Sequence, residues 1–133
     1  MPIGYVRREA TERGGASGIE ALRAETVQIV VDRRFADALL EVHPGDDLVV
    51  LTYFHLGSRD VLQVFPRGDR SRPRRGVFST RSPDRPNPIG LITVRVLRVD
   101  GNVLHVRGLD SLDGSPILDI KSYSEGFDSP YEG

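Results

Sequence analysis

Short stretches of alternating or continuous apolar residues dominate the sequence, and their lengths and turn signals are typical of β-strands. Residues 26–31 (TVQIVV) are rich in β-branched side chains, and residues 48–55 (LVVLTYFH) are apolar enough for a strand buried on both faces. Residues 91–99 and 103–109 flank the turn Asp100-Gly101-Asn102, the strongest β-hairpin signal in the chain. The pattern therefore predicts a mainly antiparallel sheet.

Three shorter strands are predicted at residues 3–6, 61–65 and 116–120. One helix is predicted over residues 33–42, where Phe35, Leu39 and Val42 have helical spacing before a Pro-Gly pair. About seven strands without a strand-helix alternation predict an all-β fold, a single-sheet β-barrel with one short helix, and one domain spanning residues 1–133. The remaining segments are expected to be loops, at residues 7–18, 66–75 and 81–90.

Composition narrows the classes of chemistry. The 133 residues contain no cysteine, and the three histidines (His43, His55 and His105) lack close ligand spacing, so neither thiolate chemistry nor a bound metal is expected. Phosphate-loop and nucleophile-elbow motifs are absent from the sequence. No apolar run approaches the roughly 18 residues of a membrane-spanning helix, and the first residues do not form a secretory signal. We therefore expect a cytoplasmic protein.

Charge is separated along the chain although the net charge is only −1. Seven arginines against two aspartates give residues 67–85 a local charge of +5, whereas six acidic residues against one lysine give residues 110–133 a charge of −5. Guanidinium groups bind phosphate with paired hydrogen bonds and stack on bases. The arginines fit phosphate binding, but a codon bias toward arginine explains most of them equally well.

The segment from Arg81 to Gly90 (RSPDRPNPIG) is the first candidate for a binding site. Its three prolines exclude a helix or a central strand and stiffen the backbone before folding. Arg81, Arg85 and Asn87 would then be polar groups on a rigid frame, which suits a ligand with carboxylate, ribose and base edges. The alternative is a loop that closes the barrel, with arginines that only face water.

A turn with two carboxylates, LDSLDGSP (residues 109–116), is the second candidate. Gly114 permits a positive φ after Asp113, which favours a structural Asx turn at that position. Asp110 ends the preceding strand, where its carboxylate could meet a ribose hydroxyl or a cationic ligand. On residue chemistry alone, His55 at the end of an apolar strand is more typical of a structural histidine than of a ligand contact.

The segments RSPDRPNPIGL and LDSLDGSPILDIKSY resemble the signature motifs of the TsaA/TrmO-like family, and the start IGYV and residues 48–76 extend the resemblance over nearly the whole chain. The resemblance implies a β-barrel methyltransferase that binds S-adenosylmethionine near a homodimer interface. It also implies methylation of the exocyclic N6 of threonylcarbamoyladenosine next to the anticodon of tRNA. The cofactor pocket implied by the matching motifs consists of His55, Leu56, Arg81, Arg85, Asn87, Leu91, Gly108, Leu109 and Asp110.

Roles for two further groups follow from this reading. The acceptor nitrogen is a poor nucleophile, so a hydrogen-bond acceptor near its proton is useful, and Asp113 and Tyr123 are the candidates. RNA phosphates would be bound by the arginine-rich segment, namely Arg67, Arg70, Arg72, Arg74 and Arg75.

Two departures from the family pattern leave other functions open. Where family members often have a Pro-Arg-Gln stretch, this chain reads ATERGGASG, with Arg13 as the stand-in, and no additional C-terminal domain follows the DIKSY motif. The alternatives are a methyltransferase that acts on a small metabolite and a non-catalytic module that binds S-adenosylmethionine or RNA.

Overall fold

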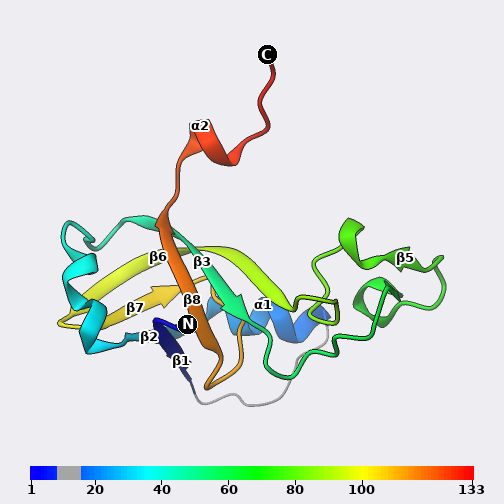
Figure 1. The fold of residues 1–133 in the computed structure, drawn as a ribbon, viewed down its shortest axis with the longest axis horizontal. Coiled ribbons are helices and arrows are strands. Elements are labelled where there is room, and N and C mark those ends of the chain that lie inside the picture. Colours follow the sequence, from blue (N-terminus) through cyan, green and yellow to red (C-terminus); the bar gives the residue numbers. More distant parts are fainter. Residues whose placement is uncertain (9–15) are drawn as a thin grey trace.

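Six strands close into an antiparallel barrel in the computed structural model, which describes residues 1–8 and 16–133 (Figure 1). Around the barrel the order is β1-β2-β7-β6-β3-β8, and every pair of neighbours is antiparallel. The predicted fold class is therefore confirmed. The strands are β1 (Gly4–Arg7), β2 (Thr26–Val31), β3 (Asp47–Tyr53), β6 (Ile89–Asp100), β7 (Val103–Arg107) and β8 (Pro116–Ser122).

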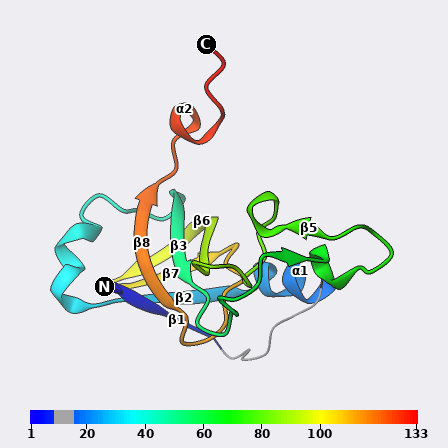
Figure 2. The ribbon, with the colours of Figure 1, turned by 45° about the vertical axis from the view of Figure 1, so that its right-hand side comes forward.

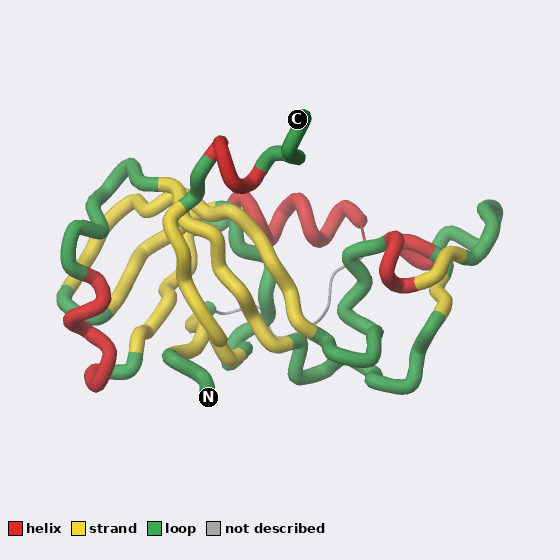
Figure 3. The backbone as a smooth tube through the Cα atoms, turned by 45° about the horizontal axis from the view of Figure 1, so that its top comes forward, coloured by secondary structure: helices red, strands yellow, loops and turns green. Residues whose placement is uncertain are grey.

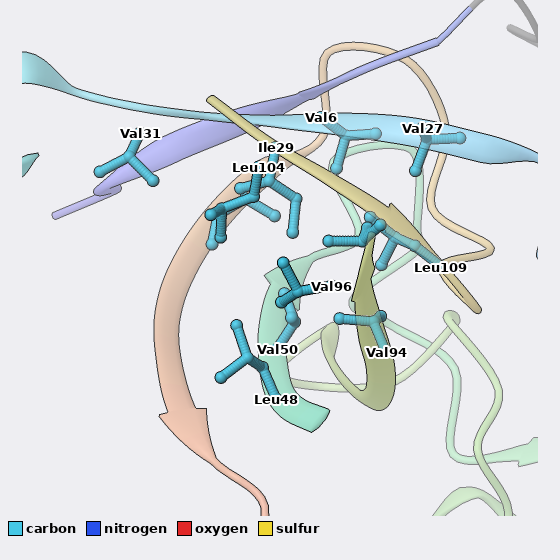
Figure 4. Close-up of a cluster of buried hydrophobic side chains, with 12 residues drawn as sticks. Val6, Val27, Ile29, Val31, Leu48, Val50, Val94, Val96, Leu104 and Leu109 are labelled. Atoms are coloured by element: carbon cyan, nitrogen blue, oxygen red, sulfur yellow. The ribbon is translucent and has the colours of Figure 1, made fainter. Parts of the chain in front are cut away.

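Alternate residues of these strands fill the barrel with aliphatic side chains (Figure 4). In β2, for example, Val27, Ile29 and Val31 are buried while the residues between them are not. This period of two, combined with β-branched side chains, stabilises a strand with one face in a core. The other buried aliphatic side chains of the cluster are Val6, Leu48, Val50, Val94, Val96, Leu104, Val106, Leu109 and Ile117.

The predicted hairpin is present, because Asp100 pairs with Val103 around Gly101 and Asn102. Gly101 has a φ of 59°, a conformation that glycine adopts without steric cost. The seam that closes the barrel is much shorter than this hairpin. Gly4 pairs with Ile117 and Tyr5 with Pro116 across β1 and β8, and backbone bonds of Val6 with Ser115 and Gly114 continue the seam beyond β8.

One end of the barrel is covered by η1, a 3₁₀ helix at Arg33–Leu39 that Asp32 caps through the N–H of Arg34. Phe35 and Leu39 pack against the core, as their spacing predicts. The helix predicted over residues 33–42 is present, but it is a 3₁₀ helix and ends at Leu39. The chain leaves helical geometry at Leu40, and Glu41 has a φ of 70°.

A second helix, α1 (Ala16–Ala24), begins inside the segment expected to be a loop over residues 7–18. Its sequence starts with small residues and glycine, so it lacks the apolar periodicity that identifies an amphipathic helix. Leu22 is buried, and Arg23 is bonded to the backbone of Gly108. Tertiary contacts thus hold a helix that local pattern does not reveal.

Between β3 and β6 the chain forms an extension at the end of the barrel away from η1 (Figure 2). The strand predicted at residues 61–65 is reduced to β4 (Gln63–Val64), which pairs with β5 (Arg75–Gly76). The extension also contains two 3₁₀ turns, η2 (Pro66–Gly68) and η3 (Val77–Ser79). After β8, a terminal segment with α2 (Glu125–Asp128) projects from the barrel (Figure 1). Within the described ranges, no helix is long and apolar enough to span a membrane.

The strand pair β3 and β6 carries an ion pair with a pH-dependent contribution to stability. Arg95 donates from Nε and its terminal nitrogen to the two carboxylate oxygens of Asp47 at 2.9 and 3.1 Å. The Arg95 guanidinium lowers the pKa of Asp47. Because the folded-state pKa is depressed, the stabilisation is present above the unfolded value of about 3.9 and disappears as pH falls through the folded pKa.

We therefore expect Asp47→Asn to lower the free energy of unfolding at pH 7 and to lose this effect in strong acid. Urea unfolding at pH 7 and at about pH 2.5 measures the difference. Asp37→Asn is the matched control, because the exposed carboxylate of Asp37 has no ion pair among the described residues. An equal destabilisation by Asp47→Asn at both pH values would show that the ion pair is not its cause.

Candidate functional site

A cavity of about 1290 Å³ lies where the extension joins the barrel. Most of its walls are loops, which occupy the region between the sheet and the extension (Figure 3). Its lining includes the turn after β3, the proline-rich loop (residues 81–90), the start of β6, the turn after β7 and the helix α1. Both sequence motifs singled out above therefore reach one cavity.

The proline-rich loop is fastened to the turn that follows β3. The backbone N–H of Ser58 donates to the Asp84 carboxylate at 2.9 Å, and the N–H of Arg85 donates to the Ser58 carbonyl at 2.9 Å. A Cβ atom at Gly57 would lie 2.4 Å from the carbonyl oxygen of Pro83. The two segments are in such close backbone contact that only glycine fits at position 57.

Arg85 holds the proline-rich loop from inside. Its guanidinium donates to the carbonyls of Thr80 at 3.0 Å, Ser82 at 3.2 Å and Val77 at 3.0 Å. The group lines the cavity, but its donors are used largely by the backbone of its own loop. Arg85 therefore gives the loop its shape, and a direct cofactor contact stays a prediction.

Four other predicted cofactor residues come together at the cavity: His55, Leu56, Arg81 and Leu91 all line it. Arg81 also donates to the carbonyl oxygen of Leu91 at 3.0 Å, which ties the start of the proline-rich loop to β6. Asn87 lies outside the cavity lining and accepts a long hydrogen bond of 3.4 Å from Arg59.

The cofactor residues predicted at the end of β7 do not all line the cavity. Asp110 lines the cavity, whereas Leu109 is fully buried in the barrel core. Gly108 has a φ of 110°, and its carbonyl and N–H bond to Arg23 of α1 at 2.9 and 3.0 Å. Gly108 and Leu109 thus shape the wall that carries Asp110.

The two candidate proton acceptors lie outside the cavity lining. Asp113 accepts the backbone N–H of Arg8 at 2.8 Å and is followed by Gly114 with a φ of 81°, which is the structural turn that the glycine favours. Tyr123 follows β8 at the opposite end of β3 from the cavity, and its N–H donates to the Asp47 carbonyl at 3.1 Å. Its hydroxyl donates to Glu125, which raises the pKa of the phenol.

The arginine-rich segment borders the same cavity through Arg67, Arg70 and Arg75. The guanidinium groups of Arg70 and Arg74 lie 5.0 and 5.8 Å from the centre of the Phe65 ring. Among the described residues, Arg72 is the member of this segment with a carboxylate within 4.0 Å, that of Asp69 at 3.7 Å. The segment therefore presents cationic groups, most of which are not neutralised.

Several features of the site were not predicted. Gly57, the helix α1, and the buried residues Arg8 and Ser111 carried no recognisable signal, because each acts through contacts between segments far apart in sequence. Arg13, the stand-in for the Pro-Arg-Gln stretch, lies outside the described residues. Over residues 1–8 and 16–133, no cluster of three or more histidine and acidic side chains is arranged to hold a metal ion.

Comparison with known proteins identifies relatives of this architecture. Residues 11–129 match the family model described as the tRNA-methyltransferase O N-terminal domain. A probable S-adenosyl-L-methionine-binding protein of Methanothermobacter thermautotrophicus is 44% identical over 128 residues, which cover 96% of this chain and 91% of that protein. An S-adenosyl-L-methionine-binding protein of Archaeoglobus fulgidus is 42% identical over 127 residues, covering 96% and 90%.

Solved structures that resemble this chain point to the same family as the family model does. A crystal structure of TrmO superposes with a TM-score of 0.75 at 30% identity and covers 99% of this chain. TrmO from Pseudomonas aeruginosa superposes with a TM-score of 0.74 at 28% identity, again over 99% of this chain. This chain spans 60% and 58% of the two crystallised chains. The barrel and its cavity thus belong to a member of the tRNA-methyltransferase O N-terminal domain family.

Proposed function

We propose that this chain is an S-adenosylmethionine-dependent methyltransferase that methylates N6 of threonylcarbamoyladenosine next to the anticodon of tRNA. The observation that carries the proposal is the convergence of two distant motifs on one cavity. Arg81 and Leu91 come from the proline-rich loop and β6, and Asp110 comes from the turn after β7. The names of the family and of its curated relatives supply the reaction class and the cofactor.

The residues of the cavity fit S-adenosylmethionine. Leu56 and Leu91 provide apolar surface for the adenine and the methionine chain, and Asp110 provides a carboxylate for a ribose hydroxyl or the ammonium group. The hydroxyl of Ser111, also part of the wall, is buried without a hydrogen-bond partner among the described residues. An unpartnered buried polar atom calls for an explanation, and a polar group of the bound ligand is the one that this proposal offers.

S-adenosylmethionine supplies an electrophilic methyl group, so the task of the protein is alignment. The loop that Arg85 and Ser58 hold rigid fixes Arg81 in the wall and lowers the entropy lost on binding. Asp110 lines the cavity, as do Glu20 and Asp84, and in this proposal it joins Asp113 as a candidate acceptor for the N6 proton. Tyr123 lies at the opposite end of β3 from the cavity, and its pKa is raised, so neither its position nor its proton affinity supports a role in removing the N6 proton.

The arginine-rich segment supports tRNA as the substrate. Its cationic groups border the cavity, where phosphates on either side of a bound nucleoside would lie. The Phe65 ring holds Arg70 and Arg74 beside it, which orders two flexible side chains before RNA binds. A substrate with several phosphates uses such a surface, whereas a small neutral metabolite does not.

A homodimer is also part of the proposal. Leu56, Phe78 and Leu91 border the cavity but are 55%, 85% and 49% exposed. Exposed apolar side chains gathered at one site indicate a protein interface. A second copy of the chain on this face would cover them and enclose the cavity.

The direct test uses purified protein, S-adenosylmethionine with a labelled methyl group, and tRNA that contains threonylcarbamoyladenosine. Nuclease digestion and mass spectrometry should detect the label on N6 of that nucleoside. Arg81→Ala should reduce transfer at least tenfold, because it removes a wall residue and its bond to Leu91. Arg34→Ala, an exposed arginine at the other end of the barrel, should leave transfer unchanged.

Other outcomes of this experiment would favour one of the alternative functions. Cofactor binding without RNA binding, and transfer to a small acceptor, would favour a metabolite methyltransferase, a reading motivated by the net charge of only −1. Binding without transfer to any acceptor would favour a sensing module. Failure to bind S-adenosylmethionine would contradict the proposal itself.

A further inference from the structure

Arg8 is a buried charged residue at the junction of two cavity walls. It directly follows β1, and its side chain is 1% exposed. One terminal nitrogen of its guanidinium donates to the carbonyls of Leu109 at 3.0 Å and Ser111 at 2.8 Å. The other donates to the carbonyl of Leu22 at 2.7 Å and the carboxylate of Glu25 at 3.2 Å.

These contacts join α1 to the turn after β7. Leu22 belongs to α1 and Ser111 to the turn, and both residues line the cavity. The backbone N–H of Arg8 also donates to Asp113 at 2.8 Å, so a third bond fixes the same turn. A planar guanidinium can bond to both walls at once because its donors point in fixed directions.

The arrangement is unfavourable if its only purpose is stability. The Nε atom of Arg8 and the hydroxyl of Ser111 are both buried without partners among the described residues. The carboxylate that neutralises Arg8 belongs to Glu25, whose side chain is 52% exposed. Buried ion pairs are often less stabilising than apolar side chains of similar size. A function beyond stability accounts for keeping a charge here.

We propose that Arg8 is a positioning residue that presents Asp110 and the Ser111 hydroxyl to the ligand in the cavity. The proposal rests on the proposed function for the identity of that ligand. Arg8 fixes the carbonyls on either side of Asp110, so the carboxylate is held at the wall by its neighbours. The Ser111 hydroxyl has no hydrogen-bond partner among the described residues and would gain one from a polar group of the ligand.

The test compares Arg8→Lys and Ser111→Ala with Arg7→Lys, an exposed arginine one residue away that bonds to Gln28. Calorimetry with S-adenosylmethionine is done at a temperature where thermal melts show all proteins folded. We expect Arg8→Lys to raise Kd about tenfold, because lysine cannot bond both walls in the same geometry. Ser111→Ala should raise Kd about fivefold without lowering Tm, and Arg7→Lys should match wild type.

Amide exchange in the ligand-free proteins gives an independent readout. Residues 109–112 should exchange faster in Arg8→Lys than in wild type or Arg7→Lys. If wild type fails to bind S-adenosylmethionine, the proposed function fails, while the exchange result still tests the positioning of the wall. If wild type binds and Arg8→Lys lowers Tm but keeps the wild-type Kd, Arg8 is only structural and the inference is overturned.

Discussion

Arg85→Ala should weaken binding of S-adenosylmethionine by about tenfold to a hundredfold, or roughly 1.4 to 2.8 kcal/mol. The substitution removes the donor group from the carbonyls of Val77, Thr80 and Ser82, which lie along the proline-rich loop and its approach. Without these bonds, residues of the loop regain conformational freedom that binding must remove again, at about 1 to 2 kcal/mol for each residue. Calorimetry measures the loss.

Two control variants test whether the loss of affinity comes from the hydrogen bonds of the Arg85 guanidinium. Arg85→Lys keeps the charge but not the forked geometry, so it should bind nearly as weakly as the alanine variant. Arg98→Ala, on the outer hairpin, removes an exposed arginine paired with Asp100 and should bind like wild type. Wild-type affinity in Arg85→Ala would mean that the prolines alone hold the loop.

Gly57→Ala should lower both cofactor affinity, at least tenfold, and stability, by about 1 to 3 kcal/mol. The added Cβ would lie 2.4 Å from the Pro83 carbonyl oxygen and 3.1 Å from that of Phe54, and both are backbone atoms that cannot rotate away. The proline-rich loop must therefore move away from the turn after β3. Urea unfolding measures the loss of stability, and calorimetry measures the loss of cofactor affinity.

Gly126→Ala is the matched control, because a Cβ at that position in α2 meets no atom within 4 Å. It should resemble wild type in both measurements. If Gly57→Ala leaves cofactor affinity unchanged, the close contact between these loops is not required for ligand binding.

The sequence predicts the barrel well because its strands carry their own signals. The hairpin around Gly101 and the β-branched run in β2 are local patterns, and both segments form strands as expected. The helix α1 was missed for the opposite reason. Of its described side chains Leu22 is buried, and the helix is held by Arg8 and Arg23 rather than by an apolar stripe.

The sequence indicated which segments form the candidate site, but not how their side chains are arranged. Motif resemblance singled out Arg81, Leu91 and Asp110, and all three line one cavity, while their contact with a cofactor stays a prediction. It could not distinguish them from Arg85, whose guanidinium bonds to the backbone of its own loop. Which side of a backbone a side chain faces depends on long-range packing, and no pattern in a single segment reports it.

The short seam between β1 and β8 also affects how the molecule is made. During synthesis on the ribosome, Gly4 cannot meet Ile117 until residue 117 has emerged, so β1 waits with one edge unpaired. Arg8 follows β1 directly, and its carbonyl acceptors at Leu109 and Ser111 are also translated late. Barrel closure and completion of the cavity wall therefore both depend on segments that are synthesised long after β1.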